Sequence, residues 1–493
     1  MLFVNYKNAI SSSKVKITLA GTIITSVMVV IFNSWESKLA QIFSFLLMVA
    51  FIHETELRSV IYAALHMAHS ILLVPVNFFK KKNESLKEYP RIKSFLRVLR
   101  LSLIPLSITF IFFMLYCFAN PIFGNYADIA FEKFVSLFHS FFREISFERI
   151  VFIVFGAILL SAIYFRNEVK IFLLKDLSFW EKLERVKKFR KSRATDDFYI
   201  PKKWKPISPP YKTIALKNQN RRGIILFLLV NILLLIENCI DIKWLWFGFD
   251  LPEGFSLKHY VREGTGFLIA SILLSMGLLL YYFQKNQNFY SNNRLLKRFA
   301  YLWIAQNAIL CYSVFLRNFQ YIDFHGLAYK RIGVVVFLLL TVIGLITIFI
   351  KIKEIKSVYY LLRINTWAFY IVLVLLSCYN WDVKIAEYNL AHWNKGEIDV
   401  DFYLQLSDKA LPVIFKNLNS VKEQIEAHKN NKVRWIQHLD YDVFVHELEE
   451  KRDHFLTTYK DHSWLSFNMA DEHAFKELEK TDMADTMPAK SPL

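Results

Sequence analysis

The chain has 493 residues, of which 54% are hydrophobic and 46 are Phe, and its formal net charge is +18. A soluble chain of this length would carry more charge and would space its apolar residues periodically, but here they come in long blocks. A membrane-spanning helix needs roughly 20 predominantly apolar residues. The blocks therefore exclude an ordinary soluble enzyme and predict an all-α fold, a polytopic transmembrane helix bundle.

The apolar blocks predict about ten spans, five in an N-terminal transmembrane region over 1–165 and five in a C-terminal transmembrane region over 223–379. In chain order, the expected spans are 17–33, 39–53, 58–79, 101–120, 150–165, 223–240, 264–283, 300–316, 332–350 and 362–379. The second and fifth blocks are short for a membrane crossing, so nine or eleven spans stay open as alternatives. The first block lacks the cleavage pattern of a signal peptide, and further spans follow it closely.

Lysine and arginine gather between particular spans. Residues 80–100 hold eight of them against two acids, and the basic loop 166–222 holds seventeen against six. The loops 284–299 and 351–361 are also basic. Because cytoplasmic loops accumulate these residues, all four are expected inside, which puts both termini outside if there are ten spans. Three lysines before the first span favour the opposite side, so an inside N-terminus remains the alternative.

The pattern changes to that of a soluble protein after the last span. Amphipathic helices predict a small C-terminal soluble helical domain over 380–480, which is expected to be extracytoplasmic and to bind a protein partner, followed by a disordered tail over 481–493. Residues 380–493 carry a net charge of −7, against +25 for the rest of the chain. Basic loops at an anionic inner leaflet account for the positive charge, so membrane lipid is an expected partner and nucleic acid is not.

Standard catalytic signatures are missing from the sequence. It contains no phosphate-binding loop, no His-Glu-x-x-His and no Gly-x-Ser-x-Gly. The four cysteines lie within or at the ends of predicted spans and form no Cys-x-x-Cys motif; they are Cys117, Cys239, Cys311 and Cys378. Such cysteines indicate neither a disulfide scaffold nor a thiolate metal site. No cofactor and no catalytic residue is therefore predicted.

Ionisable residues toward the outer ends of the later spans form the candidate ligand site. A charged side chain at the centre of a span costs about 2.5–3.5 kcal/mol on insertion scales, so such residues are functional candidates. Glu237 lies near the end of the sixth span, Arg262 precedes the seventh, and Arg317 ends the eighth; His325 follows in the next outer loop. We predict a polar pocket for a solute or a lipid headgroup, with a purely structural ion pair as the alternative.

Two histidines in the third span, His66 and His69, are the candidate metal ligands. Their spacing of three residues places them on one helix face, where imidazoles can bind a transition metal or relay protons. A metal site would need a third ligand from elsewhere in the chain, and the sequence indicates none. The alternative is that both histidines pack between helices.

Several short stretches follow one another in a characteristic order from the sixth span onward. They are Tyr260-Val261-Arg262-Glu263-Gly264, Leu316-Arg317, Tyr321-Ile322, Gly326-Leu327, Lys330-Arg331-Ile332, Asn380-Trp381-Asp382, Ile385-Ala386-x-Tyr388-Asn389-Leu390, Asp399-Val400-Asp401, Leu406-Ser407-Asp408, Ala410, Pro412 and Trp464 to Asn468. Over roughly 220–480, these stretches resemble the bacterial membrane family catalogued as domain of unknown function 4153, with its 4173-numbered relative. The N-terminal half is similar to that family only in being hydrophobic. The resemblance implies the architecture and a bacterial inner membrane, but no activity.

Three classes of function remain open. The first is a non-enzymatic scaffold, sensor or assembly factor acting through the extracytoplasmic domain, which is favoured by a bundle with few polar groups joined to an acidic helical module. The second is a small-solute or lipid transporter, which needs a continuous polar path through the spans. Isolated candidates for such a path are Asn231, Glu237, Gln306, Asn307 and Asn365. The third is an integral membrane enzyme acting on lipid or envelope substrate at the outer face.

Overall fold

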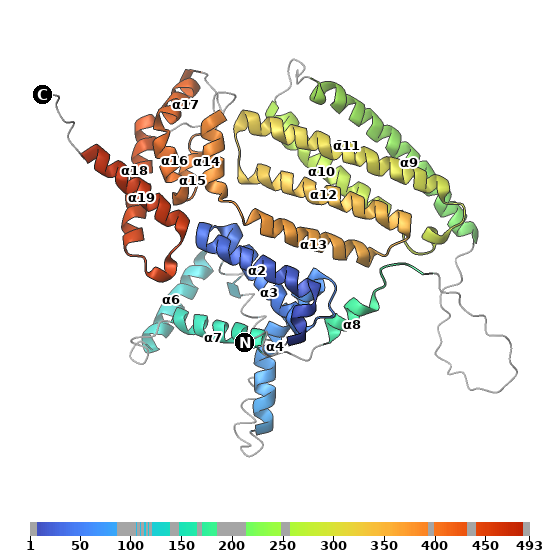
Figure 1. Ribbon diagram of the computed structural model, residues 1–493, viewed down its shortest axis with the longest axis horizontal. Coiled ribbons are helices and arrows are strands. Elements are labelled where there is room, and N and C mark those ends of the chain that lie inside the picture. Colours follow the sequence, from blue (N-terminus) through green and yellow to red (C-terminus); the bar gives the residue numbers. More distant parts are fainter. Residues whose placement is uncertain are drawn as a thin grey trace. The chain divides into compact units, whose positions relative to one another are not determined.

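A computed structural model describes residues 7–85, 121–138, 147–164, 170–184, 213–247, 257–392, 399–430 and 440–486, with isolated positions between 105 and 117. Within these residues the chain is 87% helical and has no strand, which confirms the predicted all-α class (Figure 1). Eight of the described helices have the length and apolar composition to cross a membrane. They are α2 (Ser13–Phe32), α3 (Trp35–His53), α4 (Val60–Ser85), α9 (Thr213–Asp241), α10 (Leu257–Tyr282), α11 (Arg294–His325), α12 (Tyr329–Glu354) and α13 (Val358–Leu376).

These eight helices coincide with eight of the ten expected spans. The expected fifth span, 150–165, forms helix α7 (Phe147–Tyr164), which is not among the eight. Its side chains are nevertheless widely exposed and apolar, as at Phe152, which is 77% exposed. The expected fourth span, 101–120, falls outside the described residues apart from single positions.

The chain divides into two compact units, residues 1–18 with 45–177 and residues 19–44 with 178–493. In the first unit, which also contains α6 (Pro121–Phe138), α4 packs against α7. The short helix α8 (Ile171–Ser178) places the buried Asp176, whose carboxylate accepts a hydrogen bond from the backbone N–H of Arg58 at 2.5 Å. This bond fixes the loop before α4, because a buried carboxylate is stable only when donors satisfy it.

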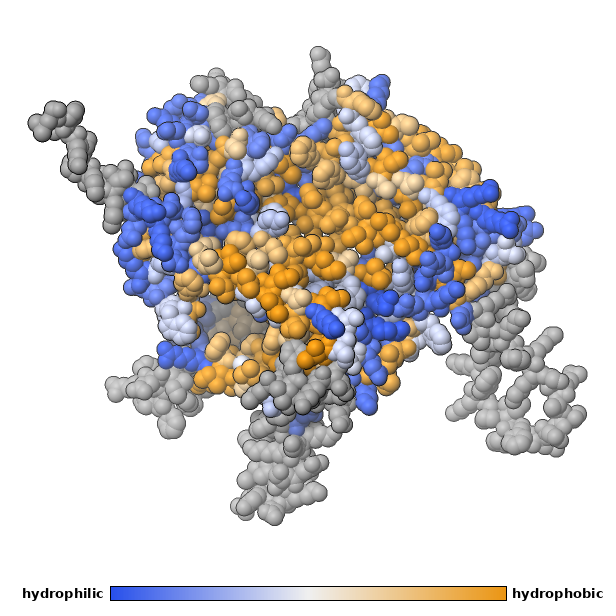
Figure 2. Space-filling model, viewed as in Figure 1, coloured by the Kyte–Doolittle hydropathy of each residue, from blue (hydrophilic) through white to orange (hydrophobic). Residues whose placement is uncertain are grey.

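In the second unit α11 is the central helix of the bundle. Helices α9, α10 and α12 all pack on α11, and α13 packs on α12. Aromatic rings fill the centre, where Phe227 of α9 and Trp303 of α11 meet edge to face with ring centroids 4.9 Å apart. Apolar side chains also cover the outside of the spans, whereas hydrophilic side chains gather over the C-terminal helices (Figure 2). A helix that is apolar on all sides is the pattern expected of a membrane-embedded bundle.

Residues 380–486 hold a group of shorter helices with its own core. The elements are α14 (Trp381–His392), α15 (Phe402–Gln405), η5 (Asp408–Ala410), α16 (Leu411–Lys416), α17 (Leu418–Asn430), α18 (Tyr441–Lys460), η6 (Trp464–Ser466) and α19 (Met469–Thr486). Their buried side chains include Tyr403, Leu411, Phe444 and Leu448, each essentially inaccessible to solvent. Helix α19 runs six residues into the segment that we expected to be a disordered tail, because no helix breaker occurs before Pro488.

The turn between α11 and α12 holds these shorter helices against the bundle. Gly326 ends α11 with φ 81° and ψ 178°, a backbone conformation essentially restricted to glycine. The side chain of Asn389 on α14 accepts a hydrogen bond from the N–H of Leu327 and donates one to its carbonyl at 3.0 Å. The hydroxyl of Tyr329 donates to Asp382 at 2.8 Å. The turn is therefore a defined joint between α11 and α14.

Candidate functional site

Polar side chains line the contact between α9 and α11. The amide nitrogen of Asn231 donates to the carbonyls of Phe227 at 2.6 Å and Phe299 at 3.1 Å, and its oxygen accepts from the amide nitrogen of Gln306 at 2.9 Å. Asn238 donates to the carbonyl of Gln306 at 3.2 Å. All three amide side chains are at least nine-tenths buried. The bond to Phe227 lies within α9, whereas the others join α9 to α11 in a region where apolar packing alone drives association weakly.

A buried ion pair lies one turn beyond these amides. Arg317 is only 4% exposed, and its Nη2 donates to Oδ1 of Asp241, which is completely buried. Glu237 lies one helical turn before Asp241, and its carboxylate is 3.7 Å from the same nitrogen. The Glu237 side chain is 40% exposed, so it is the one member of this group that reaches the surface. Glu237 and Arg317 are thus brought together as the sequence predicts.

Asp241 is the site residue that sequence reasoning does not identify. The expected sixth span stops at residue 240, whereas α9 includes Asp241 and a π-helical turn, η2 (Ile242–Trp246), extends it further. Asp241 is therefore inside the bundle instead of in a loop. Its distance of four residues from Glu237 is the signal that could have found it, because residues four apart share a helix face.

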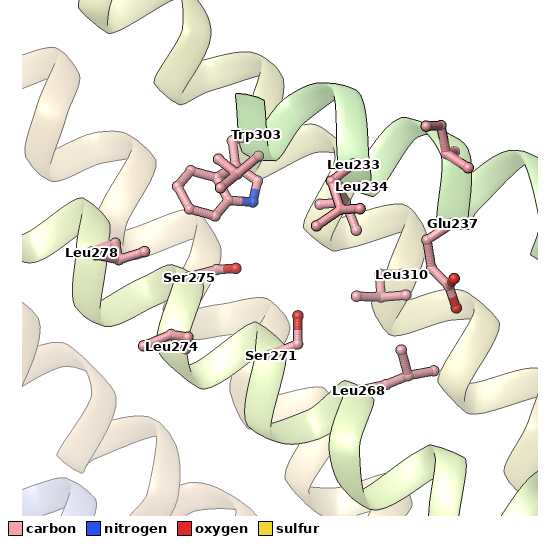
Figure 3. A pocket seen from close by; sticks show the side chains of 12 residues that line it. Leu233, Leu234, Glu237, Leu268, Ser271, Leu274, Ser275, Leu278, Trp303 and Leu310 are labelled. Atoms are coloured by element: carbon pink, nitrogen blue, oxygen red, sulfur yellow. The ribbon is translucent and has the colours of Figure 1, made fainter. Parts of the chain in front are cut away.

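Glu237 also lines a groove of about 420 Å³ between α9 and α10. Trp303 and Leu310 of α11 form its floor, and most of its wall residues are apolar; the lining is Val230, Leu233, Leu234, Ile236, Glu237, Leu268, Ser271, Leu274, Ser275, Leu278, Trp303 and Leu310. The Glu237 carboxylate and the hydroxyls of Ser271 and Ser275 point into the space between the two helices (Figure 3). Leu233 and Leu274 at its edge are 69% and 66% exposed, so the groove opens sideways on the apolar surface of the bundle.

The other two predicted ligand-binding residues are His325 and Arg262, and His325 is not among the residues that line this groove. His325 ends α11 two turns beyond Arg317, where its ring lies 4.4 Å from that of Tyr321 between centroids. Its carbonyl accepts a hydrogen bond from Arg331 at 2.8 Å, which makes His325 part of the α11–α12 turn. The backbone of Arg262 belongs to α10, but its side chain lies outside the described residues.

The two candidate metal ligands lie on α4 in the first unit. His66 is 1% exposed, and the ring of His69 meets that of Phe172 edge to face with centroids 5.6 Å apart. In the part of the chain that the structure describes, no group of three or more His, Cys, Asp and Glu residues is placed to hold a metal ion. Zinc and similar ions in proteins need at least three protein ligands. A metal site at His66 and His69 would therefore require a ligand from outside the described residues.

Comparison with known proteins identifies a family but no activity. Residues 19–417 match the family described as Domain of unknown function (DUF4153). No curated protein and no solved structure matches the chain. The match confirms the resemblance but corrects its extent, because it includes most of the N-terminal half and ends before residues 418–480. Glu237, Asp241 and Arg317 lie within it, as does the α11–α12 turn.

Proposed function

Because the chain belongs to the membrane family named domain of unknown function DUF4153, whose activity is not established, we propose a function from its site. We propose a non-enzymatic membrane sensor or assembly factor that binds a lipid-like amphiphile in the groove between α9 and α10. It acts on a protein partner through its C-terminal helical domain. The observation that carries this proposal is the groove itself, which is apolar, opens sideways and has a carboxylate at one side.

The charges of the groove indicate the chemistry of the ligand. Two carboxylates, Glu237 and Asp241, face the single guanidinium of Arg317, so the described side chains leave one negative charge in excess. Asp241 is fully buried against Arg317, which leaves Glu237 available to a ligand. A carboxylate accepts hydrogen bonds from ammonium or hydroxyl groups. The preferred occupant is therefore an apolar chain whose polar end carries such a donor.

The polar side chains of the α9–α11 contact argue against a transport path. A transporter would need Asn231 and Gln306 to face a hydrated passage, but their side chains hydrogen-bond each other, and Asn231 also donates to two backbone carbonyls. Asn365 likewise donates to Thr347 at 3.0 Å and to the carbonyl of Leu361. These amides thus have partners within the bundle, and they hold helices together instead of lining a pore.

Helix α11 supplies a physical link between the groove and the C-terminal helices. It carries Trp303 and Leu310 on the groove floor, Arg317 in the ion pair and Gly326 at its end. Asn389 of α14 is bonded to the residue that follows Gly326. A ligand that shifts α11 would therefore act directly on the joint with α14, as expected of a sensor whose two sites share one rigid element.

Filling the groove should remove the bound amphiphile. Ser271 lines the groove and is exposed, so Ser271→Phe would occupy the space without replacing a buried side chain. We expect purified Ser271→Phe protein to retain several-fold less co-purifying lipid than wild type, measured by native mass spectrometry. The matched control is Gly277→Phe on the same helix, where a Cβ atom meets nothing within 4 Å. Equal lipid retention in wild type and both variants would contradict the proposal.

We also propose that the chain lies in the bacterial cytoplasmic membrane with its C-terminal domain outside. Arg294 and Lys297 open α11, at the end of the bundle opposite to the joint with α14, and such residues favour the cytoplasmic side. Alkaline phosphatase fused after Lys480 should be active, and green fluorescent protein at the same position should be dark. A fluorescent fusion with inactive phosphatase would place the domain inside.

A further inference from the structure

The turn between α18 and α19 carries four large apolar side chains that are each at least half exposed. Trp464 is 84% exposed, Leu465 75%, Phe467 50% and Met469 54%. Only Ser466 and Asn468 separate them, and no charged residue occurs from 463 to 470. We call residues 464–469 the apolar tip. Contiguous exposed apolar side chains of this kind commonly mark a surface that contacts a membrane or a partner.

The apolar tip is held in a defined conformation. Asn468 is 1% exposed, and its side-chain oxygen accepts the backbone N–H of Asp471 at 2.9 Å, which caps the start of α19. Within the tip, the N–H of Phe467 donates to the carbonyl of Trp464 at 3.3 Å. The buried amide of Asn468 therefore anchors the turn. The large apolar side chains are exposed because the backbone of the turn is fixed in this conformation.

The base of the apolar tip lies at the end of two membrane spans. The ammonium of Lys409 is 3.8 Å from the carboxylate of Asp471, on the first turn of α19. The same ammonium donates at 3.1 Å to the carbonyl of Asn33, which lies in the turn joining α2 to α3. All of these residues belong to the second unit. Burial lowers the pKa of Lys409, and Asp471 opposes that effect.

A further exposed aromatic residue lies next to the α2–α3 turn. Trp35 is 71% exposed and begins α3, two residues after Asn33. Tryptophan is enriched where spans leave the hydrocarbon, because its ring is apolar and its N–H can reach water or headgroups. The turn between α2 and α3 is thus a membrane boundary on the side of the C-terminal domain, and α19 starts beside it. With that domain outside, α2 runs outward and the N-terminus lies inside, which is the alternative that the three lysines before the first span favour.

We propose that the apolar tip inserts into the headgroup and acyl-chain boundary of the bilayer beside the α2–α3 turn. The occupant of this surface is lipid, since the tip is uncharged, carries a Trp and a Phe, and starts from the membrane boundary. Insertion gives the C-terminal domain a second attachment to the membrane, in addition to the joint at Gly326. This proposal does not depend on a ligand in the groove.

Site-directed spin labelling of the full-length protein tests the insertion. Leu465→Cys is labelled in a chain whose four native cysteines are changed to Ser and is reconstituted in phosphatidylcholine vesicles without other proteins. We expect the label to be accessible to oxygen and several-fold less accessible to a water-soluble nickel chelate than a label at Glu449→Cys. Glu449 is exposed on α18 of the same domain and serves as the matched control.

Two outcomes would overturn the proposal. Equal nickel accessibility at both positions would place the tip in water. Broadening from a second label at position 465 would show instead that the tip contacts another copy of the chain. Either result excludes lipid as the occupant in a membrane that contains no other protein.

A second measurement avoids cysteine substitution altogether. Trp464→Phe keeps the tip apolar, and the fluorescence difference between wild type and this variant reports Trp464 alone. We expect that difference to be quenched strongly in vesicles of lipid brominated on its acyl chains and weakly by iodide in the buffer. A difference signal that iodide quenches and brominated lipid does not would also overturn the proposal.

Discussion

Arg317→Met should destabilise the bundle by about 3–5 kcal/mol, the usual cost of removing one partner of a buried ion pair. The substitution leaves Asp241 fully buried and without its cation, with the carboxylate of Glu237 one helical turn away. The loss of stability comes mainly from the unpaired carboxylate of Asp241, because the methionine preserves much of the arginine's volume. Reversible unfolding in mixed micelles, followed by circular dichroism, measures the change in free energy of unfolding.

Two further variants separate the charge from the packing. The double variant Asp241→Leu with Arg317→Met removes both charges and should recover most of the lost stability, since a buried pair can often be replaced by apolar residues. Glu237→Gln should cost well under 1 kcal/mol, because an ion pair to an exposed carboxylate contributes little. If Glu237→Gln were as destabilising as Arg317→Met, Glu237 would be a structural residue and unsuitable as a ligand contact.

Glu237→Gln also distinguishes stability from ligand binding. The variant keeps the shape of the side chain but removes the charge that the amphiphile's donor group would meet in the groove. Lipid retention should therefore fall while the free energy of unfolding changes little. If lipid retention and the free energy of unfolding fell together, the result would support a purely structural ion pair, which the sequence leaves open as the alternative.

The spans could be predicted because the signal for each of them is local. A block of apolar residues predicts a spanning helix without information from the rest of the chain. Accordingly, α12 and α13 lie close to where their composition places them. The end of α9 is different, because a π-helical turn carries the helix past the apolar block and buries Asp241. An aspartate that directly follows an apolar block is normally interpreted as the first residue of a loop. Its burial depends on Arg317, which lies 76 residues away in the sequence.

The groove could not be predicted, because it results from how the helices pack. α9 and α10 both pack on α11, and the space left between them is lined by Ser271, Ser275 and leucines that are unremarkable in a span. Similarly, the sequence places His325 and Arg317 in one outer cluster. Two turns of α11 separate them, so only Arg317 joins the ion pair.

Gly326→Ala tests the joint between α11 and α14. Gly326→Ala should destabilise the attachment of α14 by about 1–3 kcal/mol, since its φ and ψ lie in a region that costs other residues this much. An added Cβ would also lie 2.6 Å from the side-chain oxygen of Asn389, so the amide must move and its two bonds to Leu327 would weaken. Hydrogen exchange of α14 amides measures the effect, which should appear as faster exchange in the variant.

Two companion variants show whether the backbone or the contact is responsible. Gly333→Ala is the matched control on α12, where a Cβ meets nothing within 4 Å, and it should leave exchange of α14 unchanged because alanine favours a helix over glycine. Asn389→Ala removes the two hydrogen bonds without straining the turn and should accelerate exchange less than Gly326→Ala does. If Gly326→Ala had no effect on α14, the turn would not be the joint, and α11 would have no direct route from the groove to the C-terminal helices.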